Sequence, residues 1–274
     1  MATPTIFGSD AYSSREIAEK IESVGVTKAR MALLPTIMLG IVAGGFIGLG
    51  AMYYVIVASD ASMGFAAQRV LGGVVFSLGL VMVVITGADL FTGNNLLVMA
   101  WADRRITTAE VLRNWLVVYL SNAVGAMGLV LIVYWSGHAE LNGGAIGLQY
   151  VKIAAAKTSL SFVEAFFKGV LCNLLMCLAV WLAMAGRSVT DRIVAIILPV
   201  SAFVAAGFEH SVTNMYLIPL GILLRGSVPQ AAEGLDWTGL GANLLPVTLG
   251  NIAGGSVLVA LVYFLIYRRG KYDW

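Results

Sequence analysis

Six long apolar runs dominate this sequence, and each can cross the roughly 30 Å hydrocarbon core of a membrane as a helix. Their approximate bounds are 31–57, 67–99, 111–135, 161–185, 191–224 and 243–267. The chain is 59% hydrophobic and 12% charged, with a mean hydropathy of +0.88, which is typical of proteins that cross the membrane several times. The sequence therefore predicts an all-α polytopic membrane protein with six transmembrane helices.

Polar residues interrupt the second and the fifth run, and both runs are longer than the roughly 20 residues that one straight span needs. The interrupting residues are Thr86, Asp89, Thr92, Asn94 and Asn95 in the second run, and Glu209, His210, Ser211, Thr213 and Asn214 in the fifth. Non-helical backbone at membrane depth is stable only where it is buried in protein or lines a wet cavity. We therefore expect helices 2 and 5 to be broken, with both breaks facing the interior of the fold.

The two halves of the chain repeat the same spacing of polar and small residues. The matched triplets are Gly87, Asp89, Asn94 with Gly207, Glu209, Asn214, and Asn114, Asn122, Gly125 with Asn243, Asn251, Gly254. Each half contains three spans, an odd number, so the second half enters the membrane upside down relative to the first. The sequence thus predicts two inverted three-helix repeats, about 31–135 and 161–267, whose broken helices meet near the midplane and form a permeation path.

Lys and Arg residues predict the orientation of the chain. Most of the 17 lie in the N-terminal segment, the loop between the second and third runs, the loop between the fourth and fifth runs, and the C-terminal tail. Segments of this kind are retained on the cytoplasmic side. We expect a multi-pass inner-membrane protein with both termini in the cytoplasm.

The chain is expected to have three parts. Residues 1–30 form an amphipathic helix and its lead-in, residues 31–267 form the channel domain, and residues 268–274 form a tail.

The N-terminal segment carries its own helix signals. Ser13 and Glu16 have the spacing of a capping box, and Gly25 is the expected end of the helix. Apolar residues recur at helical spacing between them, which predicts a short amphipathic helix before the membrane. Two roles stay open for it: a surface helix in the headgroup layer, or a gate on the path.

The chemistry of the two breaks favours anions and polar solutes. A broken helix directs unpaired backbone N–H groups, and the positive end of a half-helix dipole, toward the gap. His210 lies in such a gap, and we expect it to meet the solute. We expect Glu209 and Asn214 to hold the broken loop.

Other residues near the breaks have alternative interpretations. Lys157 lies in a loop of small residues between the third and fourth runs, and either enters the mouth of the path or snorkels to the interface. Lys168, inside the fourth run, either snorkels, pairs with Glu164 four residues earlier, or faces an oligomer interface. The apolar residues that either constrict the path or pack in the core are Leu90, Phe91 and Phe203.

Several other function classes fit the sequence poorly. A net charge of +2 is too small to indicate nucleic-acid binding. Cys172 and Cys177 do not share a helical face, so we expect neither a disulfide nor a metal site. A redox subunit would need paired histidines as haem ligands, and only His210 lies in a span, so we expect no cofactor and no enzyme. The alternative to a transport function is a membrane redox or structural subunit. A water or glycerol channel would carry Asn-Pro-Ala motifs, which the sequence lacks.

Five stretches of the sequence resemble the formate/nitrite transporter family. They are Leu90–Thr92, Arg113–Tyr119, Leu171–Leu174, Gly207–Met215 and Pro246–Ile252. The likeness runs from about Gly25 to Arg268, and the string from Phe208 to Met215 is highly specific. The resemblance implies an aquaporin-like six-helix protomer, a homopentamer with one path per protomer, and passage of small monovalent anions or their conjugate acids.

The resemblance also implies roles for individual residues. The residues expected to line the path are Thr92, Lys157, Asn173 and His210. The residues expected to constrict it are Leu80, Leu90, Phe91 and Phe203. Independently of the resemblance, the residues at the breaks that we expect to stabilise the loops are Glu209 and Asn214, with their repeat mates Asp89 and Asn94.

The choice of substrate within the family depends on conflicting details. Asp89 stands where the family usually has Glu, and Thr92–Asn95 is closer to the nitrite-type loop, whereas Arg113–Tyr119 and Asn243–Gly255 resemble formate channels. We expect formate, moving with a proton taken from bulk water or from His210, and hence as neutral formic acid. Nitrite is the first alternative, followed by hydrosulfide and lactate.

Overall fold

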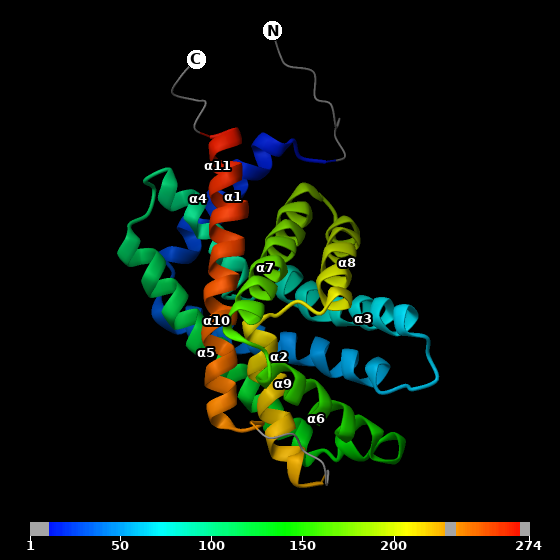
Figure 1. Cartoon of the computed structure of the whole chain (residues 1–274). Helices are drawn as coiled ribbons and strands as arrows, with labels where there is room; N and C mark the ends of the chain where they lie inside the picture. Colours follow the sequence, from blue (N-terminus) through cyan, green and yellow to red (C-terminus); the bar gives the residue numbers. More distant parts are fainter. Residues whose placement is uncertain (1–10, 228–233, 269–274) are drawn as a thin grey trace.

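The structure is a computed structural model that describes residues 11–227 and 234–268 (Figure 1). All regular elements within these residues are helical. Six helices are long and apolar enough to cross a membrane: α2 Leu33–Ala58, α3 Phe65–Thr86, α5 Thr108–Trp135, α7 Phe162–Ala185, α8 Val189–Ala206 and the continuous helix Trp237–Tyr267. The prediction of an all-α membrane protein with six membrane helices is confirmed. Residues 269–274 of the predicted tail lie outside the described residues.

The six spans form two sets with the same neighbours. In the first set α2 packs against α3 and α5, and in the second set α7 packs against α8 and α10. The last span is composed of α10, a π-helical stretch and α11, with bounds Trp237–Ile252, Ala253–Leu261 and Val262–Tyr267. The two sets meet where α3 packs against α8. Equivalent neighbours in the two halves are what the predicted repeat requires.

A shorter helix precedes each set. These helices are α1, Ser14–Ala29, and α6, Ala145–Thr158. Figure 1 shows α1 at the same end of the molecule as α11, and α6 at the opposite end. The sequence predicts a loop at α6, and this prediction is wrong. Ile146, Tyr150 and Ala154 lie one helical turn apart and bury one face of α6, so a helical signal was present.

The N-terminal helix α1 begins where the sequence predicts and ends later. The Ser13 hydroxyl accepts a hydrogen bond from the Glu16 N–H, and the Glu16 carboxylate accepts one from the Ser13 N–H, which completes the capping box. The predicted end at Gly25 is wrong, because the helix continues to Ala29. A Cβ at Gly25 would lie 3.4 Å from the Cβ of Ala100, so this glycine allows close packing against α4, Leu97–Ala102.

A glycine in the left-handed conformation ends the first helix of each long polar run. Gly87 follows α3 with a φ of 79°, and Gly207 follows α8 with a φ of 74°. A side chain at either position would be strained, which explains the choice of residue. Helical structure resumes at Gly93 with a short 3-10 turn that leads into α4, and at Ser211 with α9, Ser211–Leu224.

Two further glycines allow the long helices within each set to approach closely. A Cβ at Gly125 of α5 would overlap the backbone carbonyl of Ile41 in α2. A Cβ at Gly254, in the last span, would overlap the backbone carbonyl of Val170 in α7. Small residues at helix contacts permit this approach in membranes. The close contacts therefore occur at residues that the repeat matches to each other.

The substitution Gly125→Ala tests this close contact. We expect it to destabilise the fold by about 1–3 kcal/mol, because the added methyl group forces a backbone shift. Gly128→Ala is the matched control, since a Cβ at this position of the same helix has no heavy atom within 4 Å. Thermal unfolding in detergent should show a lower melting temperature for the first variant alone. Equal melting temperatures would contradict the contact.

Candidate functional site

A carboxylate, an amide and an ammonium group meet at the first break. The Asp89 carboxylate accepts a hydrogen bond from Asn94 Nδ2 at 2.8 Å and pairs with Lys28 Nζ at 2.9 Å. Asn94 Nδ2 also donates to Asn114 Oδ1 at 2.8 Å. We call Lys28, Asp89 and Asn94 the Lys28 triad. Since Asp89 is buried, its charge needs this pairing and these hydrogen bonds.

The second break holds an equivalent set of groups. Glu209 accepts a hydrogen bond from Asn214 Nδ2 at 2.6 Å and pairs with Lys157 Nζ at 2.8 Å. Asn214 Nδ2 also donates to Asn243 Oδ1 at 2.7 Å. We call Lys157, Glu209 and Asn214 the Lys157 triad. Glu209 and Asn214 thus contact each other at the break, and Lys157 lies beside them. The loop-stabilising role of Glu209 and Asn214 stays a prediction.

A buried asparagine satisfies the backbone of the first break. Asn122 of α5 donates through Nδ2 to the carbonyl oxygens of Gly40 and Asp89, at 2.8 and 2.9 Å. Its Oδ1 accepts the N–H of Phe91 at 2.9 Å. An unpaired backbone group at this depth costs several kcal/mol. Asn122 therefore ties the break to α2 and α5 with hydrogen bonds that lipid cannot supply.

Asn251 of α10 has the same function at the second break. Its Nδ2 donates to the carbonyl oxygens of Gly169 and Glu209, at 2.9 and 3.0 Å, and its Oδ1 accepts the N–H of Ser211 at 3.0 Å. The two asparagines thus make the same three hydrogen bonds in the two halves. Sequence spacing identified both asparagines, but it did not reveal their partners.

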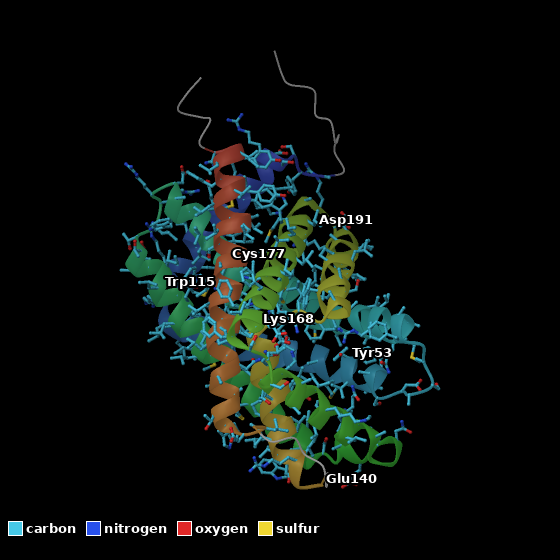
Figure 2. All side chains as sticks on the ribbon, viewed as in Figure 1. Tyr53, Trp115, Glu140, Lys168, Cys177 and Asp191 are labelled. Atoms are coloured by element: carbon cyan, nitrogen blue, oxygen red, sulfur yellow. The ribbon has the colours of Figure 1, made fainter. Side chains whose placement is uncertain are left out.

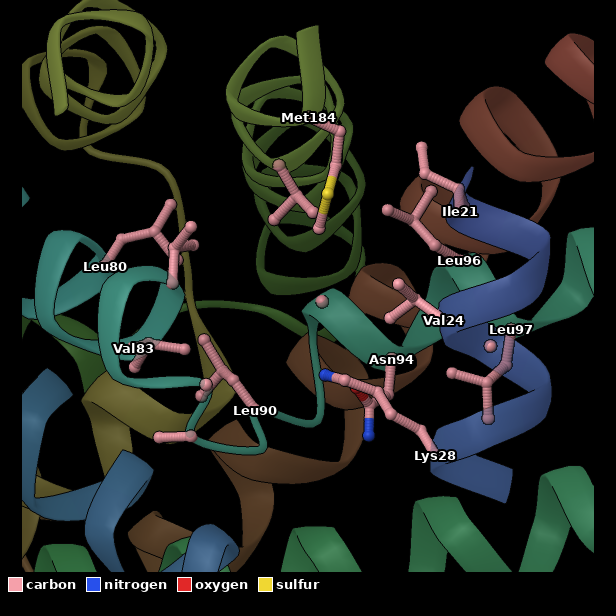
Figure 3. A pocket seen from close by; sticks show the side chains of 16 residues that line it. Ile21, Val24, Lys28, Leu80, Val83, Leu90, Asn94, Leu96, Leu97 and Met184 are labelled. Carbon is pink, nitrogen blue, oxygen red and sulfur yellow. The ribbon is translucent and has the colours of Figure 1, made fainter. Parts of the chain in front are cut away.

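A cavity of about 170 Å³ opens beside the first break, and α1 forms one wall of it (Figure 3). We call it the α1 cavity. Lys28 and Asn94 lie close together at its edge in Figure 3, and Nζ of Lys28 donates to Asn94 Oδ1 at 2.9 Å. The remaining lining is apolar or glycine and includes Ile21 and Val24 of α1. Of the two roles left open for α1, its place in the cavity wall fits contact with the path.

An ion cluster holds α1 against the end of α11. Glu22 of α1 is buried and accepts a hydrogen bond from Arg268 Nε at 2.8 Å, and Arg268 also pairs with Glu19 at 2.9 Å. Burial raises the pKa of the Glu22 carboxyl above its ordinary value, against the opposing effect of Arg268. The N-terminal helix is therefore fixed to the protein and does not lie only on the membrane surface.

A larger cavity, of about 310 Å³, opens beside the second break. Because Lys157 and neighbouring residues of α6 line it, we call it the α6 cavity. Its lining also includes Glu209 and His210, and two further cations, Arg69 and Lys168. Lys157 and Glu209 of the Lys157 triad therefore line a cavity with several charged groups, whereas Lys28 is the one charged residue, among those that the structure describes, that lines the α1 cavity.

His210 joins the two breaks through Thr92. Its Nε2 lies 2.9 Å from the Thr92 hydroxyl, and its Nδ1 lies 3.1 Å from the backbone N–H of Thr213. A backbone N–H can only donate, so Nδ1 is an acceptor and caps α9. In the neutral ring the proton is then on Nε2, which donates to Thr92 Oγ1. The Thr92 hydroxyl proton is left free for another acceptor.

The four predicted constriction residues are all buried. Their exposed fractions are between 1 and 3% for Leu80, Leu90, Phe91 and Phe203. Leu80 and Leu90 line the α1 cavity, and Phe203 lines the α6 cavity. The Phe203 ring stacks on the ring of His210 with centroids 6.2 Å apart. Phe91 packs edge-on against Tyr119 with centroids 4.9 Å apart. Within the described residues, no residue lines both cavities, and the role of the four residues as constrictions stays a prediction.

Asn173 lies at the centre of the fold beside Thr92. It donates through Nδ2 to the carbonyl oxygens of Thr92 and Asn251, at 3.2 and 2.7 Å. Both amide hydrogens are thus used to tie the first break to α10, and the carbonyl Oδ1 is its remaining polar atom. Its role in lining the path stays a prediction.

Sequence reasoning missed Lys28 and Arg69. A signal for Lys28 was present, because the separation that relates Asn114 to Asn243 also relates Lys28 to Lys157. Arg69 has no counterpart of this kind, and only the direction of its side chain places it in the α6 cavity.

Comparison with known proteins gives consistent matches over most of the chain. A sequence profile described as "Formate/nitrite transporter" matches residues 15–265. The chain is 41% identical over 270 residues to "Formate channel FocA" of Escherichia coli K12, covering 92% of this chain and 93% of that protein. It is 37% identical over 264 residues to "Formate channel FocA" of Haemophilus influenzae, with coverage of 92% and 93%.

Two solved structures share the fold. A "Pentameric formate channel with formate bound" is 38% identical, with a TM-score of 0.79 and coverage of 86% of this chain and 98% of that chain. An "FNT family ion channel" is 28% identical, with a TM-score of 0.82 and coverage of 92% and 98%.

The substitution Asn251→Leu tests the support of the second break. It leaves the buried N–H of Ser211 and the carbonyl of Glu209 without this partner, so we expect a loss of about 1–3 kcal/mol for each group. The control is Thr238→Val, a polar-to-apolar change at an exposed position of the same helix. Thermal unfolding in detergent should separate the two variants. A melting temperature for Asn251→Leu equal to that of the control would show that the break does not depend on this side chain.

Proposed function

Because this chain belongs to the formate/nitrite transporter family, we propose that it conducts formate across the inner membrane, with formate and a proton moving together. One observation carries the proposal. Two cavities lie beside two equivalent helix breaks, each with a lysine; buried leucines line one cavity, and the buried side chains of Phe203 and His210 line the other. Since one chain contains both cavities, each protomer provides its own path. No step requires a cofactor.

The orientation follows from the distribution of positive charge. Lys and Arg gather on the side of the N-terminal helix and the tail, and this side is the cytoplasm by the positive-inside rule. The α1 cavity then faces the cytoplasm, and the α6 cavity faces the outside. Formate entering from outside meets Lys157 in the α6 cavity, and Lys157 attracts its negative charge.

The energetic obstacle is the apolar constriction. Moving a bare carboxylate into a medium of low dielectric costs about 20 kcal/mol in the idealised case and several kcal/mol after relaxation. Protonating formate at pH 7 costs about 4 to 5 kcal/mol, if its pKa is similar to the 3.7 of an α-carboxyl group. Passage as the neutral acid is thus competitive with passage of the anion, and anion and proton then cross together.

The geometry favours bulk water over His210 as the source of this proton. A doubly protonated His210 would place an Nδ1–H against the N–H of Thr213 and lose the cap of α9. His210 therefore acts as a neutral ring that orients Thr92. The free hydroxyl proton of Thr92 can then donate to the oxygen of the passing solute.

Assembly as a homopentamer in the lipid bilayer is part of the proposal. One similar structure is a pentameric formate channel. Each protomer here exposes large apolar side chains in rows, for example Leu112, Leu116 and Leu120 of α5. Such rows suit contact with lipid or with a neighbouring protomer.

Counterflow of labelled formate in proteoliposomes tests the substrate. Nitrite, hydrosulfide and lactate compete at pH 6 and pH 8, with protein-free liposomes as the control. We expect formate to exchange fastest and its uptake to rise at the lower pH. Faster exchange of nitrite would favour the first alternative, which the nitrite-type loop Thr92–Asn95 supports. Uptake no faster than in protein-free liposomes would refute the proposal.

The substitution His210→Asn tests whether His210 only orients the Thr92 hydroxyl or also donates a proton to formate. Loss of one orienting hydrogen bond should slow formate uptake about tenfold at every pH, since 1.4 kcal/mol corresponds to a factor of ten. The shape of the pH profile should not change. Measurement of initial uptake between pH 5 and pH 8 checks this. A profile that shifts with the substitution would assign the proton to His210.

A further inference from the structure

The α6 cavity contains two cations that the proposed transport step does not use. Arg69 of α3 and Lys168 of α7 line it together with Lys157. Figure 2 shows Lys168 near the middle of the molecule, between Asp191 toward one end and Glu140 at the other. A lysine at this depth is unusual, because lysine side chains in membrane helices normally reach the interface or a polar cavity.

Lys168 forms no ion pair within the part of the chain that the structure describes. Snorkelling and contact with an oligomer interface stay predictions. Glu164, one turn earlier, is exposed and bound to Ser161 in the capping box of α7. It interacts with Lys168 only at longer range than an ion pair within the described residues. Lys157 differs, because its Nζ lies 2.8 Å from the Glu209 carboxylate. The charge of Lys168 is therefore available to a solute.

Arg69 adds a second available charge at the break. Its Nε donates to the carbonyl oxygen of Ala205 at 2.8 Å, at the end of α8. Gly207 gives it room, because a Cβ there would lie 2.6 Å from Arg69 Nη2. No carboxylate pairs with Arg69 among the described residues. Its guanidinium retains N–H donors beyond the one used for Ala205, and these suit a carboxylate.

The two cavities therefore differ in charge. Three cations and one carboxylate line the α6 cavity, which leaves a positive excess. The α1 cavity has one charged lining residue, Lys28, and Asp89 pairs with it. A positive excess within low-dielectric walls concentrates anions.

We propose that Lys168 and Arg69 form a second binding site for small monovalent anions, carboxylates included, in the α6 cavity and separate from the Lys157 triad. The proposal rests on the proposed function, since it concerns capture of the transported anion. The site captures anions within the α6 cavity, in addition to Lys157. It lowers the half-saturating concentration from the side of the α6 cavity and leaves capture from the side of the α1 cavity unchanged.

Substitution of Lys168 tests this site in right-side-out vesicles. Lys168→Met should raise the half-saturating formate concentration about threefold to fivefold, as Coulomb's law gives for one charge in a partly wet cavity. The maximal rate should stay within about a factor of two, since one charge outside the constriction changes capture more than passage. Lys168→Arg should restore the wild-type value. Efflux from the opposite side should not change.

Lys152→Met is the matched control, because Lys152 is an exposed lysine of α6 that does not line the cavity. We expect it to behave as the wild type. Raising the salt concentration should reduce the difference between the Lys168→Met variant and this control, since mobile ions screen the charge. Size-exclusion profiles and melting temperatures establish that all variants fold.

A binding measurement separates this inference from the proposed function. Line broadening of ¹³C-labelled formate by the detergent-solubilised protein reports binding without transport. The Lys168→Met variant should bind formate about threefold more weakly than Lys152→Met does. Equal binding and equal half-saturating concentrations for these two variants would overturn the second site, with the transport proposal intact. Binding that depends on Lys168 in a protein without formate transport would overturn the transport proposal alone.

Discussion

The structure depends on satisfying backbone groups that two helix breaks expose at membrane depth. Lipid supplies no hydrogen bonds, so each such group needs a partner within the protein. Asn122 and Asn251 each supply three hydrogen bonds to the breaks and the adjacent helices. An asparagine suits this position because its short side chain carries two donors and an acceptor. Without these bonds the polar loops that form the two cavities would have no stable conformation in the membrane.

The second constraint is the charge of the carboxylate in each break. Asp89 and Glu209 are buried, and a buried carboxylate is stable only when it is paired and hydrogen-bonded. The lysines that pair with them come from the short helices α1 and α6, not from the long spans. These helices are therefore structural parts of the site. This explains why an ion cluster around Glu22 fixes α1 in place.

Features that depend on residue spacing could be predicted from the sequence. Features that depend on the direction of a side chain could not. The breaks were predictable because polar residues at membrane depth have few stable solutions, and the repeat was visible in the matched asparagines. The repeat spacing also contained Lys28, although the prediction did not use it. The sequence missed α6, because small residues and a lysine obscured its buried face. The role of Lys168 was unpredictable, since a helical position does not show whether a side chain reaches a cavity formed by other helices.

The two breaks have equivalent backbones, but the side chains at matched positions differ in chemistry. The spacing that matches Asp89 to Glu209 also matches Leu90 to His210, so an apolar side chain faces the α1 cavity where an imidazole faces the α6 cavity. On the proposed path, an anion on the α6 side meets charged and polar groups beside Phe203 before it reaches Thr92, and meets leucines beyond it. Its main desolvation cost therefore falls on one step, past the constriction. Protonation is most useful at this step, because the neutral acid loses much less hydration energy than the anion. On the proposed path, two breaks with equivalent backbones thus place the capture of the anion and its desolvation at different positions.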